Sequence, residues 1–161
     1  MTEEQHNPIE IRPIIWRAGA VVLLDQNALP LQEREFLCRE YGEVVAAIKD
    51  LTVRGAPAIG IAAAFGIALG MRRLGTLPPE RVRIEFQEIC GDFARSRPTA
   101  RNLFWAIDRM RRRFDAACAE GMAGVGAALL AEARAILEED VAANRRMGRF
   151  RRRPSPPRRR R

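Results

Sequence analysis

The hydrophobic and polar positions of this chain change their period near residue 40. Before that point, the apolar runs 14–16 and 21–24 flank the linker Arg17-Ala18-Gly19-Ala20, which predicts a β-hairpin. Phe36-Leu37-Cys38, set between charged residues, predicts a third short strand. After residue 40 the apolar residues recur every three or four positions, as on one face of an α-helix. The chain is therefore expected to begin as a sheet and to continue as helices.

The first two helical segments differ in how much of their surface is apolar. The segment after Pro57 is apolar on every side, which indicates a buried helix. Its Gly66 and Gly70, four residues apart, would let a neighbouring helix approach closely. Segment 41–51 is apolar on one face only, at Val44, Val45, Ile48 and Leu51.

Three further helices are predicted after residue 78. The first opens at Pro79 and must end near Ser96-Arg97, since Pro98 disfavours helical geometry in the residue before it. Thr99 is placed to cap the next helix, and a glycine-containing break precedes a last helix over 125–146. The expected inward positions are Val82, Phe86, Ile89 and Phe93, then Leu103, Ile107, Met110 and Phe114, then Leu129, Ala133, Ile136 and Leu137.

Length and composition agree with one globular domain. The chain has 161 residues, of which 47% are hydrophobic. Taken with the pattern, this predicts an α+β fold in which a small N-terminal antiparallel sheet is followed by a bundle of about five helices. The domain is expected over residues 1–148. Residues 149–161 form an Arg/Pro-rich tail that we expect to be disordered.

The net charge of +8 does not by itself indicate a surface for nucleic acid. Seven arginines within 151–161 account for all but one of these charges, so the rest of the chain is nearly neutral. The tail could contact nucleic acid or acidic lipid through phosphate charge alone, but solvated charge is the simpler interpretation. Among 28 basic residues only Lys49 is a lysine, a bias typical of a GC-rich genome. No specific nucleic-acid partner is expected.

The cysteines and the apolar runs exclude several other classes. Cys38, Cys90 and Cys118 are far apart without a C-x-x-C pair, and the single histidine is His6 in a polar stretch. Neither a metal site nor a disulfide framework is expected, and reduced thiols favour a cytoplasmic location. The acidic start lacks the apolar core of a secretory signal. The uncharged run 55–71 is short and rich in Ala and Gly, so we expect a buried helix and no membrane contact.

The segment most informative about function is the start of the apolar helix. Arg54 and Gly55 stand directly before Pro57, which suits the first helical turn because its missing N–H has no intrahelical partner there. The free backbone N–H groups and the helix dipole favour an anion at such a start, and the guanidinium adds charge. A phosphate would fit at such a site. The alternative is an arginine that only caps or solvates the helix end, and neither interpretation names a reaction.

Several segments spread along the chain carry a recognisable pattern. They are Trp16-Arg17-Ala18-Gly19, Val22-Leu23-Leu24-Asp25-Gln26 and Leu29-Pro30; Ala47-Ile48-Lys49-Asp50 and Val53-Arg54-Gly55-Ala56-Pro57-Ala58-Ile59-Gly60; Ser96-Arg97-Pro98-Thr99 and Asn102-Leu103-Phe104-Trp105-Ala106; and Glu139-Asp140, Asn144-Arg145 and Gly148. Together these segments resemble the methylthioribose-1-phosphate isomerases. The resemblance runs from about residue 12 to 148, with the segments in the family's order and spacing.

The resemblance implies a step of methionine salvage. The aldose 5-methylthioribose 1-phosphate would be converted to the ketose 5-methylthioribulose 1-phosphate, without metal or nucleotide cofactor, by a homodimer. By position, Arg54, Gly55 and Ala56 would bind the sugar phosphate, and Arg97 would be a second cation facing the same ligand. Without the resemblance, Arg97 would be interpreted as an arginine that bonds free carbonyls at a corner between helices.

The resemblance also implies parts that this sequence does not contain. The family has a larger Rossmann-like C-terminal domain, in which a cysteine and an aspartate carry the chemistry. Cys38, Cys90 and Cys118 do not lie in that cysteine's motif, so we expect no catalytic residue here and no turnover by this chain alone. The departure from the family's pattern at about Arg149 predicts a truncated or frameshifted product whose tail is in a non-native frame.

Two related functions remain open. A non-catalytic regulatory relative would use the same helix start to sense a sugar phosphate or a nucleotide. A ribose 1,5-bisphosphate isomerase would share the family's reaction type with a different sugar. The missing segment, where the cysteine and the aspartate would lie, is what would distinguish these relatives.

Overall fold

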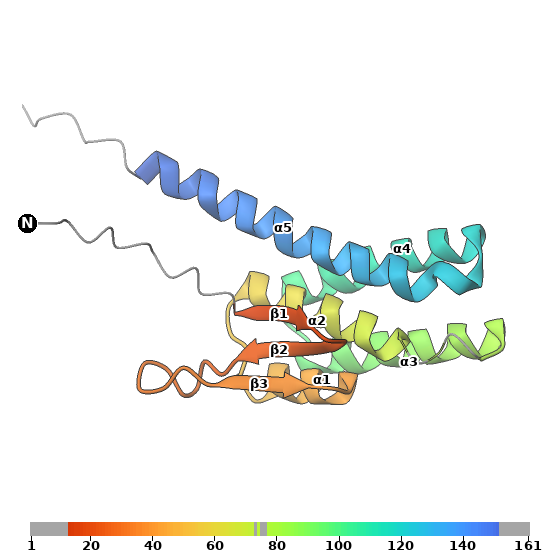
Figure 1. Ribbon diagram of the computed structural model, residues 1–161, viewed down its shortest axis with the longest axis horizontal. Helices are drawn as coiled ribbons and strands as arrows, with labels where there is room; N and C mark the ends of the chain where they lie inside the picture. Colours follow the sequence, from red (N-terminus) through yellow and green to blue (C-terminus); the bar gives the residue numbers. More distant parts are fainter. Residues whose placement is uncertain (1–12, 73, 75–76, 152–161) are drawn as a thin grey trace, which may run out of the picture.

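The computed structural model describes residues 13–72, 74 and 77–151. Within these residues, three strands come first and five α-helices follow, which confirms the predicted α+β order (Figure 1). The elements are β1 (Ile14–Arg17), β2 (Ala20–Leu24), β3 (Glu35–Cys38), α1 (Tyr41–Lys49), α2 (Ala56–Met71), α3 (Pro79–Ser96), α4 (Arg101–Glu120), the short 3-10 helix η1 (Met122–Gly124) and α5 (Val125–Arg151).

The sheet is antiparallel throughout, in the order β1-β2-β3. The predicted hairpin closes over Ala18 and Gly19, whose φ angles of 50° and 77° are both positive. Such a two-residue turn matches the right-handed twist of the flanking strands. In the register, Val21 of β2 pairs with Cys38 of β3, and both side chains are buried. The sheet thus presents an apolar face to the helices.

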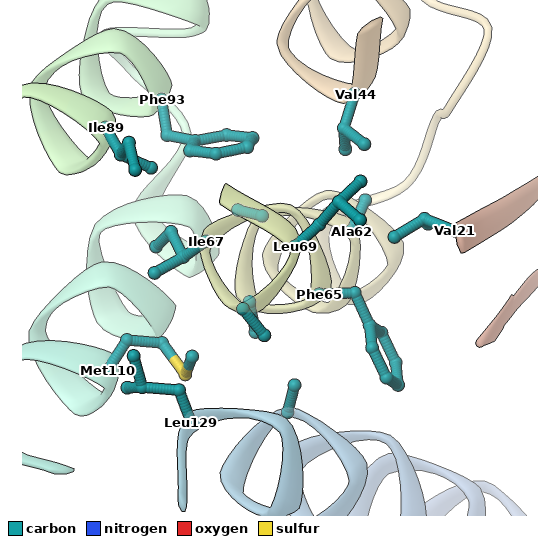
Figure 2. Packing of buried hydrophobic residues seen from close by; sticks show 14 of the residues in the cluster. Val21, Val44, Ala62, Phe65, Ile67, Leu69, Ile89, Phe93, Met110 and Leu129 are labelled. Carbon is teal, nitrogen blue, oxygen red and sulfur yellow. The ribbon is translucent and has the colours of Figure 1, made fainter. Parts of the chain in front are cut away.

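Helix α2 is the centre of the molecule. Its residues from Ile59 to Leu69 are all buried, as predicted from its apolar circumference. It contacts α1, α3, α4, α5 and the strands β1 and β2. Figure 2 views α2 close to end-on, with side chains from the sheet and from the other helices around it. Among the described residues, no helix combines the length and hydropathy needed to cross a bilayer.

Glycines bring the neighbouring helices close to α2. A Cβ placed on Gly66 would lie 2.3 Å from Cζ of Phe93, and one on Gly70 would lie 2.8 Å from Cδ1 of Ile89. These contacts confirm the predicted close approach. Gly60 does the same for α4, because a Cβ there would lie 2.8 Å from the backbone oxygen of Asn102. That third contact was not predicted from the sequence.

The apolar stripes of α3, α4 and α5 face the core as predicted. The rings of Phe86 and Phe114 stack with their centroids 3.8 Å apart, which joins α3 to α4. Leu137 is half-buried, and every other predicted inward position on these three helices is buried. The buried positions are Val82, Phe86, Ile89 and Phe93, then Leu103, Ile107, Met110 and Phe114, then Leu129, Ala133 and Ile136.

Two local predictions were wrong. Leu51 is 41% exposed, because α1 ends at Lys49 and the backbone at Leu51 turns to a φ of 69°. The helical face of α1 therefore does not extend to it. Thr99 is not the cap of α4, since Ala100 holds that position without a side-chain hydrogen bond.

Helix α5 continues to Arg151, beyond its predicted end at Arg146. Residues 149–151, the first three of the expected disordered tail, are therefore helical in their backbone. Arginine is a good helix former, and no proline interrupts the chain before Pro154. The rest of the expected tail lies outside the described residues.

Candidate anion-binding site at the start of α2

The start of α2 presents unpaired backbone donors. Gly55 is the N-cap, and the Ile59 N–H donates the first helical bond to the Gly55 carbonyl at 3.0 Å. The N–H groups of Ala56 and Ala58 therefore have no helical acceptor, and Pro57 has no N–H to satisfy. The first turn contains no acidic residue that would occupy the positive end of the helix dipole. This helix start can accept an anion.

Gly55 is required by the backbone conformation. Its φ of 90° and ψ of 135° lie in a region that residues with a side chain rarely adopt. A Cβ placed on Gly55 would meet no atom within 4 Å. The space beside the cap is therefore open, so a ligand can approach the backbone at Gly55 as predicted.

Arg54 is exposed and held at two points. Its Nε donates to the carbonyl of Leu51 at 3.1 Å, and its Nη2 donates to Oδ1 of Asn27. Within the described residues it forms no ion pair with a carboxylate. The guanidinium, carried by the residue directly before the cap of α2, is thus held by neutral acceptors. Arg54 lies directly before this helix, as predicted, whereas its contact with Asn27 was not predicted.

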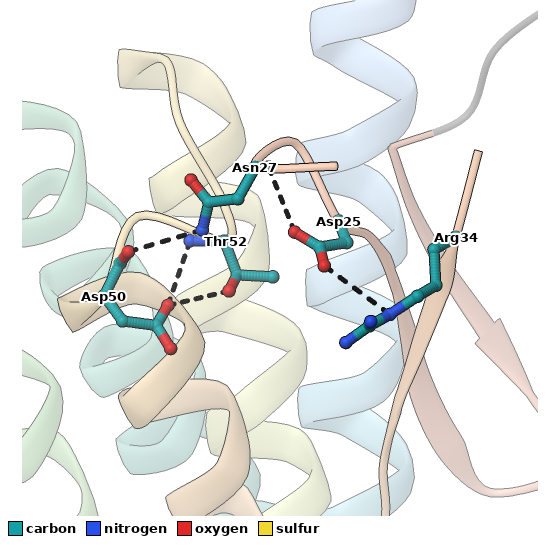
Figure 3. Close-up of polar contacts among 5 residues, drawn as sticks. All are labelled: Asp25, Asn27, Arg34, Asp50 and Thr52. Atoms are coloured by element: carbon teal, nitrogen blue, oxygen red, sulfur yellow. Dashed lines mark hydrogen bonds and ion pairs between the residues drawn. The ribbon is translucent and has the colours of Figure 1, made fainter. Parts of the chain in front are cut away.

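The loop that contains Asn27 is braced by side-chain hydrogen bonds (Figure 3). The Asn27 N–H donates to Oδ1 of buried Asp25 at 3.0 Å, and Oδ2 of Asp25 lies 3.6 Å from Nε of Arg34. On the facing segment, Oδ1 of Asp50 accepts from the backbone N–H and the hydroxyl of Thr52, at 3.0 and 2.7 Å. The Asn27 amide joins the two segments by donating to the carbonyl of Asp50 at 3.5 Å.

A cavity of about 290 Å³ lies beside the first turns of α2. Its lining combines three of the sequence segments that carried the resemblance, now brought together from α2, α4 and α5. The residues that line it are Pro57, Gly60 and Ile61 of α2, Asn102 and Trp105 of α4, and Ile136, Glu139 and Asp140 of α5. The wall is reinforced by Arg109, whose guanidinium lies 5.4 Å from the centroid of the Trp105 ring and bonds to Glu139.

Arg97 directly follows α3 and is half-buried. Its carbonyl accepts from the Ala100 N–H at 3.0 Å, whereas its side chain makes no hydrogen bond or ion pair to any described residue. It does not line the 290 Å³ cavity. The carbonyl-bonding alternative for this guanidinium is not observed.

The cysteines have the environment of structural thiols. Burial raises the pKa of the Cys38 thiol to about 12 and that of Cys90 to about 11. Burial also raises the pKa of Cys118. A neutral thiol is a poor nucleophile and a poor metal ligand. In the part of the chain that the structure covers, no three His, Cys, Asp or Glu side chains gather as metal ligands.

The sequence matches a known family over much of its length. The model of the family described as "Initiation factor 2 subunit family" matches residues 52–153. The chain is 50% identical to the methylthioribose-1-phosphate isomerase of Syntrophus aciditrophicus (strain SB), over 85% of this chain and 42% of that protein. The chain therefore spans about two fifths of the length of this curated relative.

Two solved structures contain a similar fold. The crystal structure of 5-methylthioribose 1-phosphate isomerase from Pyrococcus horikoshii OT3 matches with a TM-score of 0.82 and 34% identity, over 86% of this chain and 39% of that one. The translation initiation factor eIF-2B subunit delta from A. fulgidus matches with a TM-score of 0.74 and 37% identity, over 81% of this chain and 38% of that one. In both, the sheet and helices seen here are part of a longer chain.

Proposed function

The chain belongs to the initiation factor 2 subunit family, and we propose that it is the phosphate-binding part of a methylthioribose-1-phosphate isomerase. The proposed reaction converts the aldose 5-methylthioribose 1-phosphate to the ketose 5-methylthioribulose 1-phosphate. The observation that carries the proposal is the 50% identity to a protein of that name over 85% of this chain. The TM-score of 0.82 with a second such isomerase supports the same function.

We propose that Arg54, Gly55 and Ala56 bind the phosphate. The guanidinium of Arg54 carries no carboxylate partner in the described structure, and the Ala56 N–H lies at the positive end of α2. A phosphate at such a helix start gains both hydrogen bonds and a favourable dipole. Arg97 is proposed as the second cation, supported by its lack of a side-chain partner among the described residues.

The chemistry is proposed to reside in the C-terminal domain of the family. An aldose–ketose isomerisation moves a proton between neighbouring carbons, so it needs an acid/base group beside both. Cys38 and Cys90 are buried thiols with raised pKa values, and neither lines the cavity beside α2. We therefore expect the 161-residue chain to bind the sugar phosphate without converting it.

We also propose that the protein is a homodimer and that it is located in the cytoplasm. The three free thiols support the cytoplasmic location.

A regulatory subunit is the second candidate. The match to the A. fulgidus initiation-factor subunit at a TM-score of 0.74 is the observation in its favour. It would use the same helix start for a sugar phosphate or a nucleotide. A ribose 1,5-bisphosphate isomerase would instead require a second phosphate to be bound. Ligand preference separates the three.

The test is a calorimetric titration of the 161-residue chain. We expect 5-methylthioribose 1-phosphate to bind more tightly than ribose 1,5-bisphosphate, AMP or inorganic phosphate. Arg54→Gln removes a charge-assisted hydrogen bond and should weaken binding about tenfold or more. The control is Arg95→Gln, because Arg95 is exposed and paired with Asp92. Tighter binding of AMP, or an unchanged dissociation constant in Arg54→Gln, would contradict the proposal.

A further inference from the structure

We propose that Asn27 is a positioning residue that holds the Arg54 guanidinium in place while leaving its charge available to an anion. This inference rests on the proposed function, in which Arg54 binds the phosphate. The contact joins two segments 27 residues apart, the loop after β2 and the segment before α2. Asn27 itself has no part in the reaction and acts through Arg54.

Two hydrogen bonds other than the one to Arg54 hold Asn27 in place. Its backbone N–H donates to Oδ1 of Asp25 at 3.0 Å, and its Nδ2 donates to the carbonyl of Asp50 at 3.5 Å. The remaining polar atom of the side chain, Oδ1, accepts from Nη2 of Arg54. Figure 3 shows the Asn27 side chain between Asp25 and Asp50. The acceptor for Arg54 is thus attached to a braced loop.

The orientation of the Asn27 amide follows from its two neighbours. With Oδ1 toward Arg54 and Nδ2 toward the Asp50 carbonyl, both hydrogen bonds form. The reversed amide would place an NH₂ group against a guanidinium and an oxygen against a carbonyl, and both bonds would be lost. The amide in this orientation accepts from Arg54 and donates to the Asp50 carbonyl at once.

The neutrality of Asn27 distinguishes Arg54 from many other arginines of this chain. Arg17, Arg81 and Arg109 are each paired with a glutamate, which leaves less net charge for a ligand. Asn27 restrains Arg54 without a counter-charge. Asp50 accepts two hydrogen bonds from Thr52 at Oδ1, and among the described residues it forms no ion pair with Arg54. The arginine is therefore ordered and still fully cationic.

This arrangement gives two separable contributions to anion affinity. A long side chain that is restrained before binding loses less conformational entropy when the ligand binds. This lowers the dissociation constant about two- to tenfold. Retention of the charge preserves the electrostatic attraction to phosphate. Asn27→Ala removes the restraint and keeps the charge of Arg54. Asn27→Asp keeps an acceptor of the same shape for Arg54 and adds the counter-charge, while it loses the hydrogen bond to the Asp50 carbonyl.

The experiment measures both quantities in the full chain. NMR of the ligand-free protein gives the rotation rate of the Arg54 guanidinium about its Nε–Cζ bond, and calorimetry gives the dissociation constant for 5-methylthioribose 1-phosphate. Asn27→Ala should speed the rotation and weaken binding two- to tenfold. Asn27→Asp should keep the rotation slow and weaken binding about tenfold or more. The control is Gln32→Glu, which adds the same charge to an exposed position of the same loop and should change binding by less than about twofold.

The outcomes separate this inference from the proposed function. If Asn27→Ala leaves the guanidinium rotation unchanged, or if Asn27→Asp binds as tightly as the wild type, the inference is wrong. If the wild-type chain does not bind the sugar phosphate, the proposed function fails, and the rotation rates still decide whether Asn27 positions Arg54. A loss of slow rotation in Gln32→Glu would indicate a general loop effect and would also overturn the inference.

Discussion

Arg109 of α4 and Glu139 of α5 form a two-point ion pair, with Nη1–Oε2 and Nη2–Oε1 distances of 2.5 and 2.7 Å. The Nε of the same arginine donates to Glu132 at 2.5 Å, so one guanidinium binds two acids of α5. Arg109 also lies over the ring of Trp105. Because Glu139 and Trp105 line the cavity beside α2, this arginine fixes the spacing of two cavity walls.

Replacement of Arg109 by methionine should destabilise the protein. The arginine side chain is 19% exposed and that of Glu132 is 21% exposed, so its loss leaves a partly buried carboxylate unpaired. We expect the free energy of unfolding to fall by about 1–3 kcal/mol, measured by urea denaturation. The control is Arg81→Met, which removes a more exposed pair with Glu85 and should cost less than about 1 kcal/mol. Equal losses of unfolding free energy in the two variants would contradict the stabilising role of the partly buried Arg109–Glu132 pair.

The Arg109–Glu139 pair should make the free energy of unfolding depend on pH in the acidic range. The hydrogen bond from Arg109 holds the pKa of Glu139 below its ordinary value of 4.5. A lowered folded-state pKa stabilises the protein above the unfolded-state value, and the gain is lost as pH falls through the folded-state pKa. The difference in urea midpoint between wild type and Glu139→Gln should therefore be constant near neutrality and shrink below about pH 4.5. A difference that grew on acidification would be opposite to the expected sign.

Gly60 should not tolerate a side chain. An added Cβ would lie 2.8 Å from the Asn102 backbone oxygen, so Gly60→Ala must push α4 away from α2 beside the cavity. We expect a loss of about 1–3 kcal/mol in the free energy of unfolding. Gly42→Ala is the matched control, because a Cβ on that helical glycine meets nothing within 4 Å. It should leave stability unchanged or raise it by up to about 1 kcal/mol.

The three thiols should react with a disulfide reagent at different rates. The pKa of Cys38 rises from 9.0 to about 12 and that of Cys90 to about 11, which lowers their thiolate fractions at pH 8 by roughly 1000-fold and 100-fold. Cys118 is only half-buried and should react first. A colorimetric thiol assay should show one faster thiol in the native chain and three in urea. Fast labelling that persists in Cys118→Ser would show that Cys38 or Cys90 is accessible.

The helices and strands were predictable because the spacing of apolar residues within each segment indicates which face is buried. The apolar circumference of α2 and the stripes ending at Phe93 and Phe114 needed no knowledge of their partners. The errors lie where tertiary context or backbone geometry decides. Leu51 continues the helical spacing of α1 but lies beyond the end of that helix. The N-cap of α4 is Ala100, one residue after Thr99, although threonine is the better capping residue.

The candidate site was predictable only in its local part. The Arg54-Gly55 helix start is contiguous, so its backbone chemistry could be inferred from residue types and order. Asn27 lies 27 residues from Arg54, and its contact arises because the β2–β3 loop and the segment before α2 meet in the fold. No periodicity links those two positions. The cavity wall from α5 was likewise brought to α2 by the fold alone.

The apolar circumference of α2 has a consequence for how the domain folds. A helix with no polar face has no stable half-docked state, because each side left uncovered exposes hydrophobic surface to water. The sheet and the surrounding helices must therefore close on α2 as one cooperative unit. The anion site at the first turn of α2 is therefore complete only when the elements around α2 have closed on it.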